Sequence, residues 1–115
     1  MSFRINSKQA LELWRDALVE SVRHEAPDLS ARQMAILLLV YLDDEPQTVR
    51  GLAAQLDISK PAVTRALDRL SQLGYARRVK DEADRRNVLL RRTVKGSVFM
   101  SEFAELVVAA SRTLG

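Results

Sequence analysis

Arginine and lysine side chains are concentrated in one part of this chain, and the chemistry they offer is the binding of phosphate. Residues 59–92 contain ten basic and four acidic residues, a net charge of +6. The rest of the 115 residues contain eight basic and eleven acidic residues, a net charge of −3. Charge of one sign on one third of a chain is typical of a surface that faces nucleic acid. The alternative is an ordinary solvated basic face.

The other reactive residue types do not form a catalytic or metal-binding set. The chain has no cysteine, and its one histidine, His24, has no partner with which to hold a metal ion. Asp43, Asp44 and Glu45 form a carboxylate cluster, but beside Pro46 we expect them in a solvent-facing turn. No Ser/His/Asp set and no phosphate-binding glycine loop is present in the sequence. We therefore expect no enzyme activity, no cofactor and no metal ion.

Length and hydropathy favour one soluble domain, residues 1–115. The apolar run at residues 35–42 is too short to span a membrane. The first residues lack the pattern of a secretion signal. The absence of cysteine is compatible with a reducing compartment. We expect a cytoplasmic protein without a membrane partner.

Two short helices joined by a tight turn are predicted over residues 48–74. Thr48 is a good N-cap, and apolar residues follow it at helical spacing up to Leu56. A turn at residues 57–58 follows, Ser59 caps the second helix, and Gly74 ends it. The inner face of the second helix is predicted to comprise Val63, Ala66, Leu67, Leu70 and Leu73.

The outward face of that second helix carries polar and basic side chains, and a helix of this size fits the DNA major groove. The face is predicted to comprise Lys60, Ala62, Thr64, Arg65, Asp68, Arg69 and Gln72. Arg65 could bind guanine through two hydrogen bonds, and Ala62 or the Thr64 methyl could contact a thymine methyl. The positive end of the helix dipole adds to the attraction for phosphate. The alternative is a solvated helix face on which Asp68 and Arg69 pair locally.

A basic β-hairpin is predicted next, with strands at residues 76–80 and 87–92. Its turn contains Asp81, Asp84, Arg85 and Arg86, which suits an acid that orients an arginine toward a narrow, electronegative minor groove. The alternative is a solvated turn with weak surface ion pairs, each worth less than about 1 kcal/mol. The strand side chains that would face phosphates or water are those of Arg77, Arg78, Lys80, Arg91 and Arg92.

Helices with wide apolar stripes flank this region. The first, residues 6–26, carries Leu11, Trp14, Leu18 and Val22 at helical spacing, more than one neighbouring helix would cover. A buried helix should begin at the capping box formed by Ser30 and Gln33. The last helix, residues 94–112, has an apolar stripe of Phe99, Phe103, Leu106, Val107 and Ala110. The flanking helices could line the core or bury themselves in a partner subunit, with residues 30–92 as the DNA-binding core.

The order of these motifs resembles that of the MarR-type winged helix-turn-helix transcriptional regulators, the multiple-antibiotic-resistance regulator family. The similar segments cover residues 29–96, and the wing signature, at its proper distance from the helix-turn-helix, is the most specific. In chain order they are Leu29-Ser-x-x-Gln33 with Leu37, Thr48-Val-x-x-Leu52-Ala53, Ile58-Ser59 with Val63-Thr64-Arg65, Leu70-x-x-x-Gly74-Tyr75-Ala76-x-Arg78, Asp81-x-x-Asp84-x-Arg86 and Thr93-x-x-Gly96.

The resemblance implies a mainly α winged helix-turn-helix fold with a small β-hairpin wing. It also implies a homodimer on pseudo-palindromic duplex DNA, with the helix after Ser59 in the major groove, Arg86 in the minor groove, and the outer helices forming the dimer. Two departures matter. Arg92 stands where the family usually has an apolar residue, so added charge and looser strand packing are expected. The chain ends at Gly115, about where a further dimerisation helix would begin, which leaves dimer geometry and any effector pocket open.

The sequence thus predicts a homodimeric, sequence-specific binder of double-stranded DNA that represses transcription. The alternative is a winged helix that binds a protein partner, or DNA without sequence preference as an architectural factor. The sequence does not determine the operator, the regulated genes or a small-molecule effector. DNA contacts are predicted for Thr48, Ser59, Lys60, Pro61, Ala62, Thr64, Arg65, Arg69, Arg78, Asp84, Arg85 and Arg86. Dimer contacts are predicted for Leu11, Trp14, Leu18, Phe99, Phe103, Leu106 and Val107.

Overall fold

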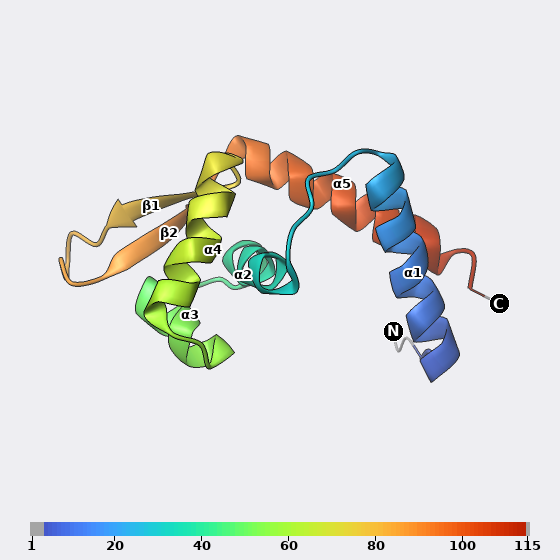
Figure 1. The fold of residues 1–115 in the computed structure, drawn as a ribbon, viewed down its shortest axis with the longest axis horizontal. Coiled ribbons are helices and arrows are strands. Elements are labelled where there is room, and N and C mark those ends of the chain that lie inside the picture. The colour runs from blue at the N-terminus through green and yellow to red at the C-terminus, as the bar shows by residue number, and fades with distance from the viewer. Residues whose placement is uncertain (1–3, 115) are drawn as a thin grey trace. The chain divides into compact units, whose positions relative to one another are not determined.

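The computed structural model describes residues 4–114, which form five helices and one antiparallel hairpin (Figure 1). The predicted class, mainly α with a small β-hairpin, is confirmed. Residues 29–99 form one compact unit, and the chain before Leu29 together with the chain from Met100 forms another. The elements are α1 (Ser7–Arg23), α2 (Ala31–Leu42), α3 (Val49–Leu56), α4 (Lys60–Gln72), β1 (Ala76–Lys80), β2 (Val88–Arg92) and α5 (Val94–Ser111).

Hydrogen-bonded caps confirm the predicted helix starts. Asn6 and Ser30 form capping boxes, in which each side chain accepts from the amide three residues later, at 2.8 and 3.0 Å. Thr48 and Ser59 cap α3 and α4 in the same manner, at 2.9 and 3.2 Å. Each such cap stabilises its helix by about 1 kcal/mol. Between α3 and α4, Asp57 adopts a left-handed conformation (φ 53°) that closes the tight turn.

The core of the unit 29–99 is built from the inner faces of α2, α3 and α4. Five of its large side chains are 0% exposed: Ile36 and Leu37 of α2, Leu52 of α3, and Leu67 and Leu70 of α4. Helix α4 contacts both α3 and α2. Full burial of one such side chain stabilises the fold by about 1.5–3 kcal/mol. The core therefore holds α4 firmly while leaving its opposite side free for function.

The hairpin leaves this core directly from the end of α4. Gly74 takes a positive φ of 79°, a conformation that glycine adopts without strain, and β1 follows. Strands β1 and β2 pair from Ala76↔Arg92 to Lys80↔Val88. Strand β2 is also joined to the segment before α3, because the Leu90 amide donates to the Gln47 carbonyl at 2.9 Å. This link ties the hairpin to α3 as well as to α4.

Strand β2 begins one residue later than predicted. The Asn87 amide donates to the Asp84 carbonyl at 2.9 Å, and the Asn87 carbonyl accepts from the Asp81 amide at 3.2 Å. Asn87 therefore belongs to the turn, which its side chain also joins through a 3.5 Å hydrogen bond to Asp81 Oδ2.

A hydrogen-bonded junction joins α2, the turn after α4 and the start of α5. The Tyr41 hydroxyl donates to the Tyr75 carbonyl at 2.6 Å and accepts from the Thr93 amide at 3.1 Å. Thr93 Oγ1 donates to the Gly74 carbonyl at 2.6 Å and accepts from the Gly96 amide at 2.9 Å, so Thr93 caps the start of α5. A Cβ at Gly96 would collide with the Tyr41 hydroxyl and the Tyr75 carbonyl, so this position requires glycine.

In the other unit, large apolar side chains remain exposed on α1. Among the residues of this unit that the structure describes, those that are buried are small, namely Ala17 and Ala110. Leu11, Trp14 and Val22 are 70%, 52% and 69% exposed. The flanking α1 thus presents an apolar face that this chain alone does not cover.

Two structural features were searched for among the described residues: a membrane-spanning helix and a metal site. Within residues 4–114, no helix is both long enough and apolar enough to cross a membrane. The same part of the chain contains no group of three or more His, Cys, Asp or Glu side chains placed to hold a metal ion.

Candidate nucleic-acid interface

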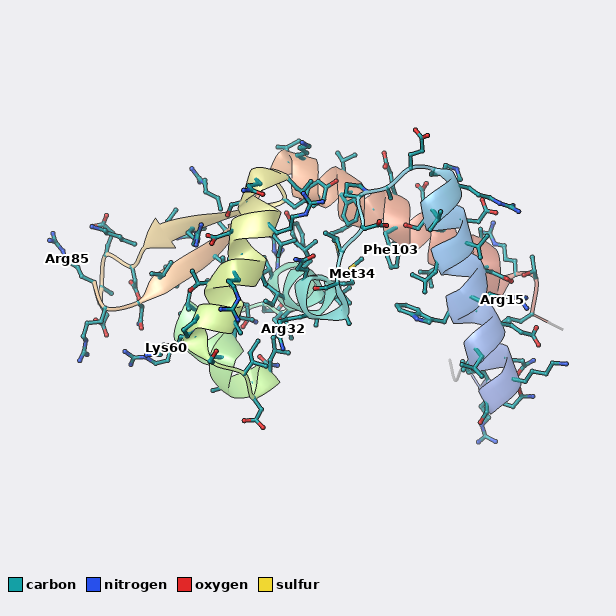
Figure 2. The ribbon with its side chains drawn as sticks, viewed as in Figure 1. Arg15, Arg32, Met34, Lys60, Arg85 and Phe103 are labelled. Atoms are coloured by element: carbon teal, nitrogen blue, oxygen red, sulfur yellow. The ribbon has the colours of Figure 1, made fainter. Side chains whose placement is uncertain are left out.

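The N-terminal half of α4 presents a polar, basic face to solvent. Ser59, Lys60, Thr64 and Arg65 are all exposed, as is Pro61 in the first turn, where a missing amide proton breaks no helical bond. Within residues 4–114, neither the Lys60 side chain nor the Arg65 side chain takes part in a hydrogen bond or an ion pair. Figure 2 shows Lys60 at the start of α4, extending away from the ribbon. The Lys60 and Arg65 side chains are therefore available to a ligand without breaking an internal contact.

The prediction is wrong for one residue of the outward face of α4. Ala62 is 6% exposed and belongs to the core, together with Val63 and Ala66. The reason is that α4 contacts both α3 and α2, so its buried arc is wider than the single stripe that the sequence suggested. Ala62 cannot contact a thymine methyl from there, which leaves the Thr64 methyl for that role.

An ion pair connects α4 to the first strand of the hairpin. Arg78 Nη2 donates to Asp68 Oδ1 at 2.7 Å, and the two side chains are 34% and 55% exposed. The predicted local alternative, a pair between Asp68 and Arg69, is not formed. Arg78, which was expected to face phosphate or water, is exposed, and its guanidinium also links β1 to α4. Arg69, also a predicted DNA contact, is half-buried.

At the tip of the hairpin, Asp84 holds Arg86 in a two-point contact. Arg86 Nε donates to Asp84 Oδ1 at 3.1 Å and Nη2 donates to Oδ2 at 3.2 Å, while the Arg86 amide also donates to Oδ1 at 3.1 Å. The Arg86 side chain is nonetheless 78% exposed. The predicted arrangement, an acid that orients an outward-pointing arginine, is present in the structure. Two-point pairing of this kind fixes direction as well as charge.

The Asp84–Arg86 contact also sets the charge state of Asp84. Hydrogen bonds from the Arg86 side chain, and then from its backbone amide, lower the pKa of Asp84 below its ordinary value. Asp84 is thus a carboxylate at neutral pH, as the pairing requires. Arg85, the neighbouring predicted contact, is exposed and points away from the hairpin in Figure 2.

Arg50 is a candidate that sequence reasoning missed. It lies in the first turn of α3 and is exposed, and its positive charge makes a further, smaller contribution to lowering the pKa of Asp84. Arg50 therefore lies near the wing tip. Its position two residues after the N-cap Thr48 was the available signal, because helix starts attract phosphate. Thr48 itself is half-buried and uses its hydroxyl to cap α3.

Arg92 behaves differently from the other strand arginines. Its Nε donates to the Val40 carbonyl at 2.8 Å and its Nη2 donates to the Asp43 carbonyl at 2.9 Å. Its guanidinium also lies 5.8 Å from the centre of the Tyr41 ring. The expectation of looser packing at this position is wrong, since Arg92 connects the end of β2 to the end of α2.

The predicted dimer residues fall into three groups. The α1 side chains Leu11, Trp14 and Leu18 are exposed. Phe103, Leu106 and Val107 are half-buried, and Figure 2 shows Phe103 on α5. Phe99 stacks on Tyr75 with 4.4 Å between ring centres and so contributes to the unit 29–99. One face of its ring is therefore already covered within this chain.

Solved structures of similar fold include both ligand-bound and DNA-bound proteins. Tm0710, a transcriptional regulator from Thermotoga maritima, is similar with a TM-score of 0.68 and 27% identity over 91% of this chain and 68% of that one. CouR from Rhodococcus jostii RHA1, bound to p-coumaroyl-CoA, has a TM-score of 0.66 and 25% identity over 90% and 71% of the two chains. Reduced AbfR bound to DNA has a TM-score of 0.65 and 22% identity over 90% and 70%, and supports the fold alone.

Comparison of the sequence with protein families, rather than with single proteins, shows which family this chain belongs to. No curated protein sequence matches the chain significantly. The MarR family model, however, matches residues 28–87, which is more than half of the chain and includes α2, α3, α4, β1 and the hairpin turn. With the capped α3–turn–α4 arrangement and the arginine-tipped wing in place, the chain belongs to the MarR family of DNA-binding transcriptional regulators.

Proposed function

We propose that this protein is a homodimeric repressor that binds a specific duplex DNA sequence, with α4 in the major groove and the wing tip in the minor groove. The observation that carries the proposal is Arg86, held by Asp84 in a two-point contact yet 78% exposed at the end of the hairpin. A narrow minor groove concentrates negative potential and attracts such an arginine. A fixed and exposed orientation of this kind suits an arginine that binds a group outside the protein.

Helix α4 supplies the base-reading part of the proposal. Arg65 and Thr64 are exposed in its N-terminal half, and Lys60 begins the helix. A guanidinium can donate two hydrogen bonds to guanine O6 and N7, and the Thr64 methyl can contact a thymine methyl. Ser59, Lys60 and the positive helix end suit phosphate contacts, which fix register without reading sequence. Arg50 extends this phosphate-binding surface along α3.

The apolar face of α1 supports a homodimer. Its exposed side chains, Leu11, Trp14, Leu18 and Val22, form a stripe on one helix. Clustered apolar surface of this kind is usually an interface. A two-fold dimer places two recognition helices about one DNA turn apart, roughly 34 Å, so the proposed site is a pseudo-palindrome. Binding such a site within a promoter would block transcription, in the cytoplasm where a bacterial-type operator is found.

The competing function is binding of DNA without sequence preference, or of a protein partner. The basic charge of residues 59–92 is what favours this alternative, because charge alone attracts any duplex. Selection of bound fragments from genomic DNA separates the two. Under the proposal one sequence motif is enriched, and its complex is about a thousandfold or more tighter than a complex with random DNA.

Repetition of the selection at raised salt sharpens this test. Non-specific complexes depend mostly on counterion release and dissociate first as salt rises, so the enriched motif should become purer. Equal retention of all fragments at every salt concentration would contradict sequence-specific regulation. Absence of any DNA retention would favour a protein partner instead.

A further inference from the structure

The side chain of Arg92 satisfies backbone carbonyls at the end of α2. Helices leave their last four carbonyls without an intrahelical partner, and Val40 is among the last four residues of α2. Val40 is 6% exposed, so an unpaired carbonyl there would be costly. Arg92 Nε reaches this carbonyl at 2.8 Å, and Nη2 reaches the Asp43 carbonyl at 2.9 Å.

The charge of Arg92 also complements the helix end. The last turn of α2 contains no basic residue of its own, whereas the negative end of a helix dipole favours a cation. The guanidinium lies 5.8 Å from the centre of the Tyr41 ring, which adds a cation–π contribution. Arg92 is therefore held by α2 through three kinds of interaction at once, although it belongs to β2.

Its place in the fold makes this anchor important for the wing. Arg92 is the last residue of β2 and pairs with Ala76, the first residue of β1, so it lies at the base of the hairpin. The next residue, Thr93, is bound by Tyr41 of α2. The base of β2 is thus attached to α2, while Arg78 attaches β1 to α4. Both attachments determine where the distant tip of the hairpin lies relative to α4.

We propose that Arg92 is a positioning residue, which anchors the base of the wing to the end of α2 so that Arg86 reaches the minor groove while α4 occupies the major groove. Although its charge suggests a phosphate contact, Arg92 does not serve as one. This inference rests on the proposed function for its effect on DNA binding. The anchoring itself can be tested on the free protein.

Two substitutions in the full chain separate anchoring from phosphate binding. Arg92→Ala removes both hydrogen bonds and the charge. Arg92→Lys keeps the charge but replaces the planar two-point donor with a single ammonium, which binds phosphate well and cannot reproduce the fork. Arg91→Ala is the matched control, since it removes the same charge from the adjacent strand position.

Hydrogen exchange of the free proteins is the first measurement. We expect the hairpin amides to exchange about tenfold faster in Arg92→Ala and Arg92→Lys than in the wild type, and no change in Arg91→Ala. Amides of α4 should stay protected in all three, which shows that the fold is intact. Unchanged exchange in the hairpin of both Arg92 variants would overturn the inference, whatever the DNA results are.

DNA affinity, measured on the selected site with and without Arg86→Ala, is the second measurement. Arg92→Ala should weaken binding about tenfold alone but less than about twofold in the Arg86→Ala background, because it acts through Arg86. Arg92→Lys should also lose affinity, by roughly threefold. Wild-type affinity in Arg92→Lys, or full additivity with Arg86→Ala, would show a phosphate contact and overturn the inference. If the wild type selects no site, the proposed function fails, and the exchange result still decides the anchoring.

Discussion

The two units of this molecule differ in how completely they bury their own apolar side chains. In the unit 29–99, thirteen apolar residues are buried, including every large side chain that is 0% exposed. In the unit formed by the chain before Leu29 and after Phe99, the buried residues are Ala17 and Ala110, while Leu11, Trp14 and Val22 are at least half exposed. One unit has a core of its own, and the other carries an apolar surface.

Under the proposed function, this contrast separates the two tasks of a dimeric regulator. The unit 29–99 must hold α4 and the wing in a fixed relation before DNA arrives, and its caps, ion pair and junction hydrogen bonds do so without a partner. Under the proposed function the other unit would gain its stabilisation from association, because exposed apolar side chains contribute little until another surface covers them. Stability of the two units should therefore respond differently to mutation and to protein concentration.

The largest expected effect is a loss of stability when a side chain in the core of the unit 29–99 is truncated. Leu67→Ala removes a side chain that is 0% exposed and should lower the free energy of unfolding by about 2–5 kcal/mol. Chemical denaturation at fixed protein concentration measures this loss. Leu42→Ala, at a side chain 71% exposed in the same unit, is the matched control and should cost less than about 1 kcal/mol. Equal losses in both variants would contradict the contrast.

Association through α1 is the next test of the comparison. Trp14→Asp places a charge on the exposed apolar stripe and should weaken dimerisation by about 2 kcal/mol or more, with the unit 29–99 still folded. Sedimentation at micromolar concentration should show a wild-type dimer and a dissociating variant. A monomeric wild type would remove dimerisation from the proposal.

Arg86→Ala should reduce affinity for the selected site about a hundredfold, roughly 2.7 kcal/mol, without unfolding the protein. Folding is preserved because the Asp84–Arg86 pair lies at the surface, where such pairs contribute little to stability. Fluorescence anisotropy and thermal unfolding measure the two quantities separately. Unchanged affinity would exclude the wing from DNA binding.

Arg65→Ala should relax base preference at one position of each half-site by about 1–3 kcal/mol. Arg65 is exposed in the N-terminal half of α4, where recognition helices contact bases. Binding to a panel of single-base variants measures this preference. A uniform loss on all sequences would make Arg65 a phosphate contact only.

The smallest expected effect concerns pH. The folded-state pKa of Asp84 is lowered, so the contribution of its pair with Arg86 is fully present above the ordinary carboxyl pKa and is lost only as pH falls through the lowered value. DNA affinity should therefore show no change attributable to Asp84 between pH 8 and about pH 5. Asp84→Asn imitates protonation and should weaken binding at neutral pH. Loss of wild-type affinity between pH 7 and pH 5 that is absent in Asp84→Asn would refute this assignment.

Local features of the fold could be predicted from the sequence because they depend on residues two or three positions apart. The capping side chains of Asn6, Ser30, Thr48 and Ser59 each bond an amide three residues later, so their spacing carries the signal. The Asp84–Arg86 contact spans two residues and was predictable for the same reason. These short-range contacts define the helix starts and the wing tip.

The remaining features of the site depend on tertiary contacts that no local pattern encodes. Arg92 and Val40 are 52 residues apart, and Arg78 and Asp68 are ten apart on different elements. In the sequence, Arg78 and Arg92 looked equivalent to the other arginines of the two strands. Ala62 was placed on the wrong face because a small apolar residue suits either side of a helix, and only the packing of α4 on two helices decides between them.

Chemical footprinting of the selected site tests the central claim most directly, because methylation reports on both grooves at once. Guanine N7 is exposed in the major groove and adenine N3 in the minor groove. If α4 and the wing bind one duplex together, each half-site should show protected guanine N7 beside protected adenine N3, and Arg86→Ala should lose the adenine protection only. Protection confined to one groove in the wild-type complex would contradict the account.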